Sequence, residues 1–166
     1  QGVSSAASDV YKRQLLVYAS CWIKCHEPAI FLAALLNSQP LGFYTPSQLV
    51  QDARRHAVEV RAVDVCHSHS DCTLEELHRR PQPAIRLGLR LVSGLGHASA
   101  MRIVAARAQR PFTDAGDLAQ RAGLQLHEMK LLAAADALAS LSGHRRQQVW
   151  DLSLIHISEP TRLRRI

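Results

Sequence analysis

A glycine-rich turn near the middle of the chain constrains its fold more than any other feature. Ser93-Gly94-Leu95-Gly96 separates an alternating apolar segment, residues 84–91, from residues 97–109, where small and apolar residues recur at helical spacing. Glycine suits a turn in which the backbone takes a positive φ or in which another backbone must come close. The pattern therefore predicts a tight reversal into a helix whose first N–H groups face outward.

Outward-facing N–H groups give such a turn a chemical use. The amides at a helix N-terminus, together with the helix dipole, hold phosphate oxygens and so contact a nucleic acid without reading its bases. This is the helix-hairpin-helix pattern, although a glycine turn taken by itself is also compatible with a purely structural turn. The residues expected to contact phosphate are the turn and two neighbouring cations: Ser93, Gly94, Leu95, Gly96, His97, Arg90 and Arg102.

A second, degenerate copy of the pattern follows. Residues 126–150 repeat the order of helix, small-residue turn and helix, with Ala135-Asp136-Ala137 where glycine is expected. The missing glycine weakens the case for a phosphate contact at this turn, whereas Arg145 and Arg146 can supply positive charge. Both arginines are therefore included among the candidate phosphate ligands.

The rest of the sequence predicts a mainly α fold with a small β element. Only 5% of the residues are aromatic, and alanine and leucine are plentiful. Thr45, Pro46 and Gln48 form the pattern of a capping box, which predicts a helix from Pro46 to about His56. The other helices are expected over residues 15–25, 28–37 (with Ile30, Phe31, Ala34 and Leu35 as a buried stripe), 97–109, 114–122, 126–135 and 143–150.

The β element is expected from two alternating segments. Residues 58–65 and 84–91 alternate apolar with polar or small side chains and predict two half-buried strands that can pair. Residues 66–83 show no sustained period and predict a loop or a weak hairpin arm. Cys66, His67, His69 and Cys72 in this segment suggest zinc, but their spacing is not that of the usual zinc sites, so no metal is expected.

The composition of the chain and the sequence of its two ends limit the class of protein that is expected. The chain has 20 basic and 14 acidic residues, a net charge of +6, but residues 1–14 and 152–166 contribute half of that charge. Both ends resemble translated adapter sequence rather than natural protein, with ordinary disordered tails as the alternative, and we exclude them from the fold argument. No apolar run is long enough to span a bilayer, and four sparse cysteines suit reduced thiols. A cytoplasmic protein without a membrane partner is expected.

Longer motifs resemble one protein family. LLNSQP, GFY and PSQLVQDARRH resemble the end of the fingers domain of bacterial C-family DNA polymerases, which are related to the DNA polymerase III alpha subunit, and in particular their error-prone branch. The likeness continues through DCTLE, IRLGLRLVSGL and AADALASLSGHRRQ, so it covers about residues 16–151. It divides the chain into the C-terminal part of the fingers, residues 15–83, and a helix-hairpin-helix DNA-binding domain, residues 84–151. The family usually has an asparagine-like residue where this chain has Cys66.

The resemblance implies an activity for a longer parent protein. Such a parent adds deoxynucleotides to a primer opposite a template, using Mg²⁺ held by carboxylates of a palm that precedes this segment. Asp64, Asp71, Glu75 and Glu76 match none of those carboxylates, so no catalytic residue is expected here and the fragment alone should be inactive. The expected partner is duplex primer–template DNA, with other translesion-synthesis or replisome proteins as further partners. The alternative is a stand-alone, non-catalytic helix-hairpin-helix module of a repair factor.

Overall fold

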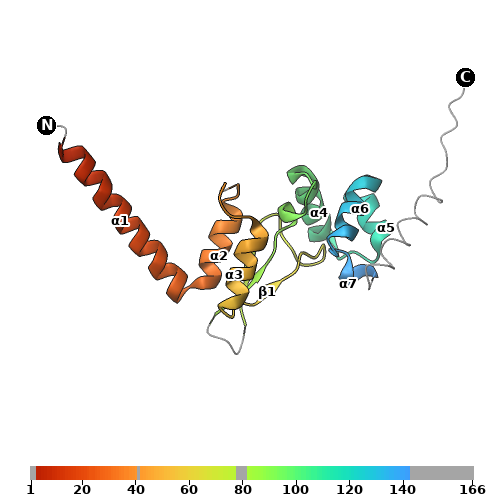
Figure 1. Ribbon diagram of the computed structural model, residues 1–166. Coiled ribbons are helices and arrows are strands. Elements are labelled where there is room, and N and C mark those ends of the chain that lie inside the picture. The colour runs from red at the N-terminus through yellow and green to blue at the C-terminus, as the bar shows by residue number, and fades with distance from the viewer. Residues whose placement is uncertain (1–2, 41, 78–81, 143–166) are drawn as a thin grey trace, which may run out of the picture. The chain divides into compact units, whose positions relative to one another are not determined.

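The computed structural model describes residues 3–40, 42–77 and 82–142, and these residues form two compact units (Figure 1). Unit 1 contains the described residues up to Val60 together with those of the segment 74–85, and unit 2 contains residues 61–73 and 86–142. The division does not follow the boundary expected between residues 83 and 84, because residues 61–73 pack with the helices that come after them. The assignment of these segments to polymerase domains stays a prediction.

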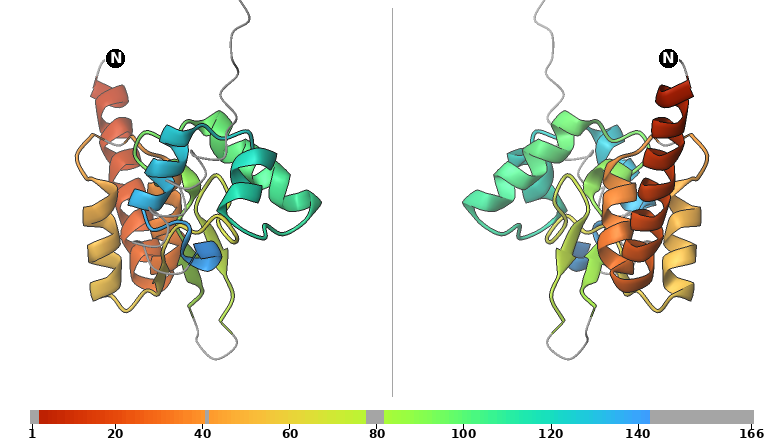
Figure 2. Two further views of the ribbon diagram at one scale, coloured as in Figure 1. Left: turned by 90° about the vertical axis from the view of Figure 1, so that its right-hand side faces the viewer. Right: turned by 90° about the vertical axis from the view of Figure 1, so that its left-hand side faces the viewer.

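Unit 1 is built from three helices, α1 (Val3–His26), α2 (Pro28–Asn37) and α3 (Pro46–Arg55). Helices α2 and α3 pack side by side (Figure 2). The expected capping box is confirmed at the start of α3, where the Gln48 N–H donates to Thr45 Oγ1 over 3.3 Å and the Thr45 N–H donates to Gln48 Oε1 over 2.9 Å. Two otherwise unsatisfied N–H groups thus find acceptors at this helix end.

The capping box leads to a prediction about the stability of Thr45 variants. Thr45→Ala should lower the free energy of unfolding by about 1 kcal/mol, because the Gln48 N–H loses its acceptor. Thr45→Ser keeps the hydroxyl and should retain most of the stability, and chemical denaturation of both variants measures the difference. An equal loss in the two variants would mean that the hydroxyl does not cap the helix.

The buried face of α2 was predicted wrongly. Its buried residues are Ala29, Leu32, Ala33 and Leu36, whereas Ile30 is 44% exposed and Ala34 is exposed. Because α2 is apolar on nearly every side, its sequence does not mark which face is buried. Helix α1 also begins earlier than expected, within residues 1–14, whose foreign origin stays a prediction. Among the helices that the structure describes, none is both long and apolar enough to cross a membrane.

Unit 2 holds a short 3-10 helix, η1 (Leu89–Leu91), and four α-helices: α4 (His97–Gln109), α5 (Ala115–Arg121), α6 (Leu126–Ala134) and α7 (Ala139–Ser142). The bounds of α4 are those expected, and Asp114 caps α5 by accepting a hydrogen bond from the Asp117 N–H over 2.8 Å. Helix α7 lies within the segment predicted as a connection, and the helix expected over residues 143–150 lies outside the described residues. The core of this unit is formed by leucines, isoleucine and small residues, including Leu89, Ile103, Leu118, Leu132 and Leu138.

The strands form a three-stranded sheet of order β1-β3-β2, from β1 (Val60–Arg61), β2 (Thr73–Glu75) and β3 (Ala84–Arg86). The expected pairing of the two alternating segments is confirmed, since β1 and β3 are neighbours. Both strands are shorter than predicted. Strand β2 lies within residues 66–83, where a loop or a weak hairpin arm was expected, and its pairing with β3 agrees with the hairpin arm. After Arg86 the chain leaves the sheet and closes into η1, where the Val92 N–H donates to the Leu89 carbonyl over 3.1 Å. The mainly α fold with a small β element is thus confirmed.

Candidate nucleic-acid interface

The glycine turn forms an exposed reversal between η1 and α4, and we call residues 89–99 the first hairpin. Gly94 has a φ of +82°, as its place in the turn requires. Ser93, Gly94, Gly96 and His97 are exposed, whereas Leu95 is 7% exposed and packs into the core of unit 2. Leu95 therefore anchors the turn, and its N–H donates to the Val92 carbonyl over 3.1 Å, so its expected contact with phosphate stays a prediction.

The two glycines of the turn serve different needs. A Cβ on Gly94 would lie 3.1 Å from Leu131 Cδ1, so both this contact and the positive φ favour glycine. Gly96 is the N-cap of α4 with an ordinary φ of −68°, and a Cβ there would meet nothing nearer than Ser99 Oγ at 3.9 Å. The fold therefore does not require glycine at position 96. What this glycine provides is an open approach to a helix N-terminus that has no side-chain cap.

A loop from earlier in the chain supports the first hairpin, and we call residues 64–72 the support loop. The Leu89 N–H donates to the His69 carbonyl over 2.9 Å, and Ser70 Oγ lies 3.2 Å from His97 Nδ1. Asp71 Oδ1 accepts a hydrogen bond from Arg90 Nη1 over 2.9 Å. Arg90 is thus an exposed cation next to the turn, held in place by an acidic partner. Its contact with phosphate stays a prediction.

Arg102 takes a structural role that the sequence analysis missed. Its Nε donates to the Ala122 carbonyl over 2.8 Å, and its Nη2 lies 3.2 Å from Ser99 Oγ and 3.4 Å from Glu128 Oε1. Glu128 is 7% exposed and also accepts hydrogen bonds from Ser99 Oγ and from the Gln125 N–H. The side chain of Arg102 therefore links α4 to α5 and α6, and its contact with phosphate stays a prediction.

The carboxylate of Glu128 is held in its charged form. Burial by itself would raise the pKa of Glu128, but the hydrogen bonds from Ser99 and Gln125 and the charge of Arg102 outweigh it. The net result is a pKa below the ordinary value. Glu128 thus acts as an anionic acceptor that joins the N-terminal turn of α4 to that of α6.

The side chains of two further arginines of unit 2 also donate hydrogen bonds to backbone carbonyls of the same chain. Arg107 Nη1 donates to the carbonyls of Val65 and Ser68 over 3.0 and 2.8 Å, and burial lowers the pKa of its guanidinium. Arg121 Nη2 donates to the Arg110 carbonyl over 3.0 Å, and its guanidinium lies 5.1 Å from the ring centre of Phe112. Arg107 thus joins α4 to residues 65–68, and Arg121 joins α5 to the connection that follows α4. Arg145 and Arg146 lie outside the described residues.

The cluster of cysteines and histidines does not form a metal centre. In the support loop His67 and His69 face solvent, whereas Cys72 is buried and its Sγ accepts a hydrogen bond from the Gly88 N–H over 3.4 Å. Burial raises the pKa of the Cys72 thiol. Within residues 3–40, 42–77 and 82–142, no three His, Cys, Asp or Glu side chains gather as metal ligands would.

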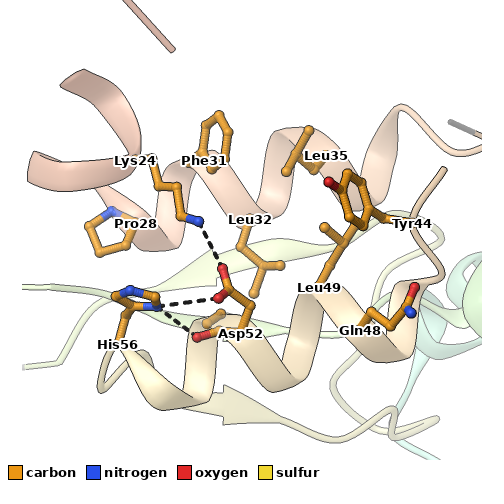
Figure 3. A pocket seen from close by; sticks show the side chains of 11 residues that line it. Lys24, Pro28, Phe31, Leu32, Leu35, Tyr44, Gln48, Leu49, Asp52 and His56 are labelled. Atoms are coloured by element: carbon orange, nitrogen blue, oxygen red, sulfur yellow. Dashed lines mark hydrogen bonds and ion pairs between the residues drawn. The ribbon is translucent and has the colours of Figure 1, made fainter. Parts of the chain in front are cut away.

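Unit 1 contains a separate pocket of about 560 Å³ between the end of α1 and helices α2 and α3 (Figure 3). Apolar side chains such as Phe31 and Leu49 line most of it. At one end, Lys24 Nζ lies 3.0 Å from Asp52 Oδ2, and His56 Nδ1 lies 2.8 Å from the Asp52 carbonyl oxygen. The hydrogen bond from Lys24 lowers the pKa of Asp52. These polar groups are paired with one another, so the pocket by itself indicates no ligand.

The exposed reversal between η1 and α4, followed by α5 to α7, defines a helix-hairpin-helix protein. The chain belongs to that family, because the family model described as helix-hairpin-helix motif matches residues 57–148. Its closer similarity is to proteins named error-prone DNA polymerase. The relative from Azoarcus sp. (strain BH72) is 59% identical over 143 residues, which cover 84% of this chain and 13% of that protein.

Two further relatives carry the same name. The protein from Pseudomonas syringae pv. tomato (strain ATCC BAA-871 / DC3000) is 54% identical over 149 residues, which cover 88% of this chain and 14% of that protein. The protein from Methylococcus capsulatus (strain ATCC 33009 / NCIMB 11132 / Bath) is 50% identical over 163 residues, covering 88% of this chain and 16% of that protein. The resemblance to error-prone polymerases is thereby confirmed, and the chain spans less than a fifth of the length of these relatives.

Proposed function

We propose that this chain is a segment of an error-prone DNA polymerase and that its first hairpin holds duplex DNA through the phosphate backbone. The observation that carries the proposal is the open helix start at Gly96, where the fold requires no glycine but a sugar-phosphate strand does require close approach. The identity of 50 to 59% with polymerases favours this interpretation over a stand-alone repair module. Contact through backbone amides implies binding without sequence preference.

The activity of the longer parent protein is part of the proposal. The parent would extend a primer on damaged template DNA during repair and replication, in the bacterial cytoplasm where the chromosome lies. Mg²⁺ would be held there by carboxylates outside this chain, whose own residues would grip the duplex next to the reacting end. Residues 15–83 would complete the fingers, and residues 84–151 would form the DNA-binding domain. Other proteins of translesion synthesis or of the replisome would be partners of the parent.

A substitution at Gly96 tests the DNA contact without weakening the helix. Gly96→Asp places an N-cap carboxylate at backbone angles that suit it, so α4 should be at least as stable as before. The same carboxylate would repel a phosphate, and the affinity for a short duplex should fall at least about tenfold at moderate salt. Fluorescence anisotropy over a range of salt concentrations measures both the affinity and its salt dependence, which for each phosphate contact has a log–log slope of about −0.9.

The control moves the same charge to the other end of the helix. Gln109→Glu adds a carboxylate at the exposed last residue of α4, roughly 18 Å from the turn at 1.5 Å per residue. Its effect on DNA affinity should be less than about twofold. Equal binding by the wild type and Gly96→Asp, with both proteins folded by circular dichroism, would rule out the first hairpin as the DNA contact.

A further inference from the structure

The second hairpin, residues 126–142, repeats the backbone geometry of the first without its glycine. Asp136 has a φ of +57°, which corresponds to the positive φ of Gly94. In each hairpin this left-handed residue stands three positions before the first residue of a helix, His97 in α4 and Ala139 in α7. Aspartate is among the non-glycine residues that tolerate this conformation best. The degenerate copy therefore keeps the shape of a phosphate-binding turn.

The two turns differ in what covers them. Leu138 occupies the position that corresponds to Gly96 and is fully buried, whereas Gly96 is exposed. Ala137, which corresponds to Leu95, is also fully buried, and its carbonyl oxygen accepts a hydrogen bond from the Val65 N–H over 2.9 Å. The support loop thus contacts the second turn at Ala137, and the two turns differ in exposure at the next position, where Leu138 is buried and Gly96 is exposed.

The support loop brings a carboxylate to the second hairpin. Asp64 is 8% exposed, and its Oδ2 accepts a hydrogen bond from the hydroxyl of Ser140 in α7. Its Oδ1 accepts from the Cys66 N–H over 2.7 Å, which fixes the side chain on its own loop. A buried carboxylate is retained where hydrogen bonds satisfy its oxygens. Asp64 therefore joins the support loop to α7 through these two hydrogen bonds.

The other end of the same loop holds the first hairpin, through His69, Ser70 and Asp71. Only four residues separate Val65, which contacts the second turn, from Ser70, which contacts His97. Arg107 of α4 further fixes the loop by donating to the carbonyls of Val65 and Ser68. A change at Asp64 thus reaches the first hairpin through a short, hydrogen-bonded segment.

We propose that the second hairpin is an internal docking site for Asp64 and Val65 of the support loop, and that this docking, with Leu138 buried where the first turn has the exposed Gly96, replaces a DNA contact at the second turn. The duplex is then gripped by the first turn alone. Asp64 acts as a positioning residue that joins the two hairpins through the support loop. The statement about DNA rests on the function proposed above, whereas the statement about Asp64 does not.

The first test compares added carboxylates at the two turns. Ala139→Asp and Ala135→Asp each place a negative charge at an exposed residue that flanks the second turn. If this turn does not contact DNA, both variants should bind duplex within about twofold of the wild type and keep its salt slope, while Gly96→Asp loses at least about tenfold. Circular dichroism confirms that each variant is folded. If the new carboxylate of Ala139→Asp repels Asp64 and disturbs the fold, Ala135→Asp still tests the DNA contact.

The outcomes separate the two proposals. A loss of affinity at the second turn that equals the loss in Gly96→Asp would overturn the internal docking while leaving the DNA-gripping function intact. No loss in Gly96→Asp would overturn the proposed function instead. In that case the role of Asp64 is decided by a second measurement that involves no DNA.

The second test asks whether a free anion can replace the Asp64 side chain. Asp64→Ala should lower the melting temperature, and formate should restore it by roughly 2 °C or more relative to the same concentration of chloride. Val65→Ala removes buried apolar atoms from the neighbouring residue without removing a charge, so formate should not restore the melting temperature of this variant. If Asp64→Ala does not fold in chloride, Asp64→Ser takes its place. An equal response of the Asp64 and Val65 variants to formate would mean that Asp64 acts only through packing.

Discussion

The Gly88→Ala variant should lose at least about 3 kcal/mol of folding free energy, because the added methyl group meets the backbone of another segment. A Cβ on Gly88 would lie 2.4 Å from the carbonyl carbon of Asp71, 2.5 Å from the carbonyl oxygen of Ser70 and 2.7 Å from the amide nitrogen of Cys72. None of these atoms can move away by a change of rotamer. The support loop and the segment that leads into the first hairpin would have to separate.

Gly96→Ala is the matched control for this substitution. It also adds one methyl group to a glycine of unit 2, but the nearest atom would be 3.9 Å away and φ is ordinary. Its cost should be about 1 kcal/mol or less, as expected for alanine at an N-cap. Urea denaturation of both variants measures the contrast. Similar stabilities would show that the two backbones are not in close contact at Gly88.

The Gly88 variant should also bind DNA more weakly than its folded fraction explains. The segment that it displaces carries Ser70 and Asp71, which contact His97 and Arg90 beside the turn. Titration of duplex DNA under conditions where circular dichroism shows a folded chain tests this consequence. Unchanged affinity would mean that the first hairpin keeps its geometry without the support loop.

Local signals in the sequence predicted most of the helices. The capping box at Thr45 and the aspartate cap of α5 act within one turn, so the residues that decide them are neighbours in the chain. The glycine turn was predicted for the same reason, since a positive φ at Gly94 is a property of the residue itself. The Gln125 and Glu128 pair at the start of α6 is a capping pattern that could have been recognised from its spacing.

Features set by distant contacts were not predictable in this way. The alternation in residues 84–91 indicated one strand, but Gly88 packs on the backbone of residues 70–72 and the chain turns into η1 instead. The buried face of α2 depends on its neighbours, because both of its faces are apolar. Arg102 was predicted to contact phosphate, which stays a prediction, but no sequence pattern indicated that α5 and α6 supply the carbonyl and carboxylate that it binds.

The candidate site shows the same difference between local features, which were predicted, and long-range contacts, which were not. The turn at residues 93–97 was predicted from consecutive residues of the sequence, and its contact with phosphate stays a prediction. Asp64 was excluded only as a catalytic carboxylate, and its contact with Ser140 was not predictable, since the two residues are 76 positions apart and no pattern joins them. The covering of the second turn is likewise a long-range contact. The copy without glycine keeps its backbone geometry because aspartate tolerates the positive φ at position 136.

Removal of the Glu128 side chain should cost about 3 kcal/mol of folding free energy, the second large effect expected in this chain. Glu128→Ala leaves Ser99 Oγ, the Gln125 N–H and the guanidinium of Arg102 without their shared acceptor. Glu128→Gln keeps the shape and one carbonyl acceptor and should lose about half as much. Chemical denaturation at neutral pH measures both. A cost below about 1 kcal/mol for Glu128→Ala would show that these groups find other acceptors.

Acid should remove the stability advantage of the wild type over the Glu128→Gln variant. The folded state lowers the pKa of Glu128, so its contribution to stability is complete above the ordinary glutamate pKa of about 4.3 and is lost as the pH falls through the lower folded-state pKa. Asp117, whose pKa is also lowered, contributes with the same sign in both proteins. The difference in free energy of unfolding between wild type and Glu128→Gln therefore isolates Glu128. It should be constant from pH 7 to about pH 5 and shrink below about pH 4, and a difference that grows on acidification would mean that the buried carboxyl is protonated in the folded state.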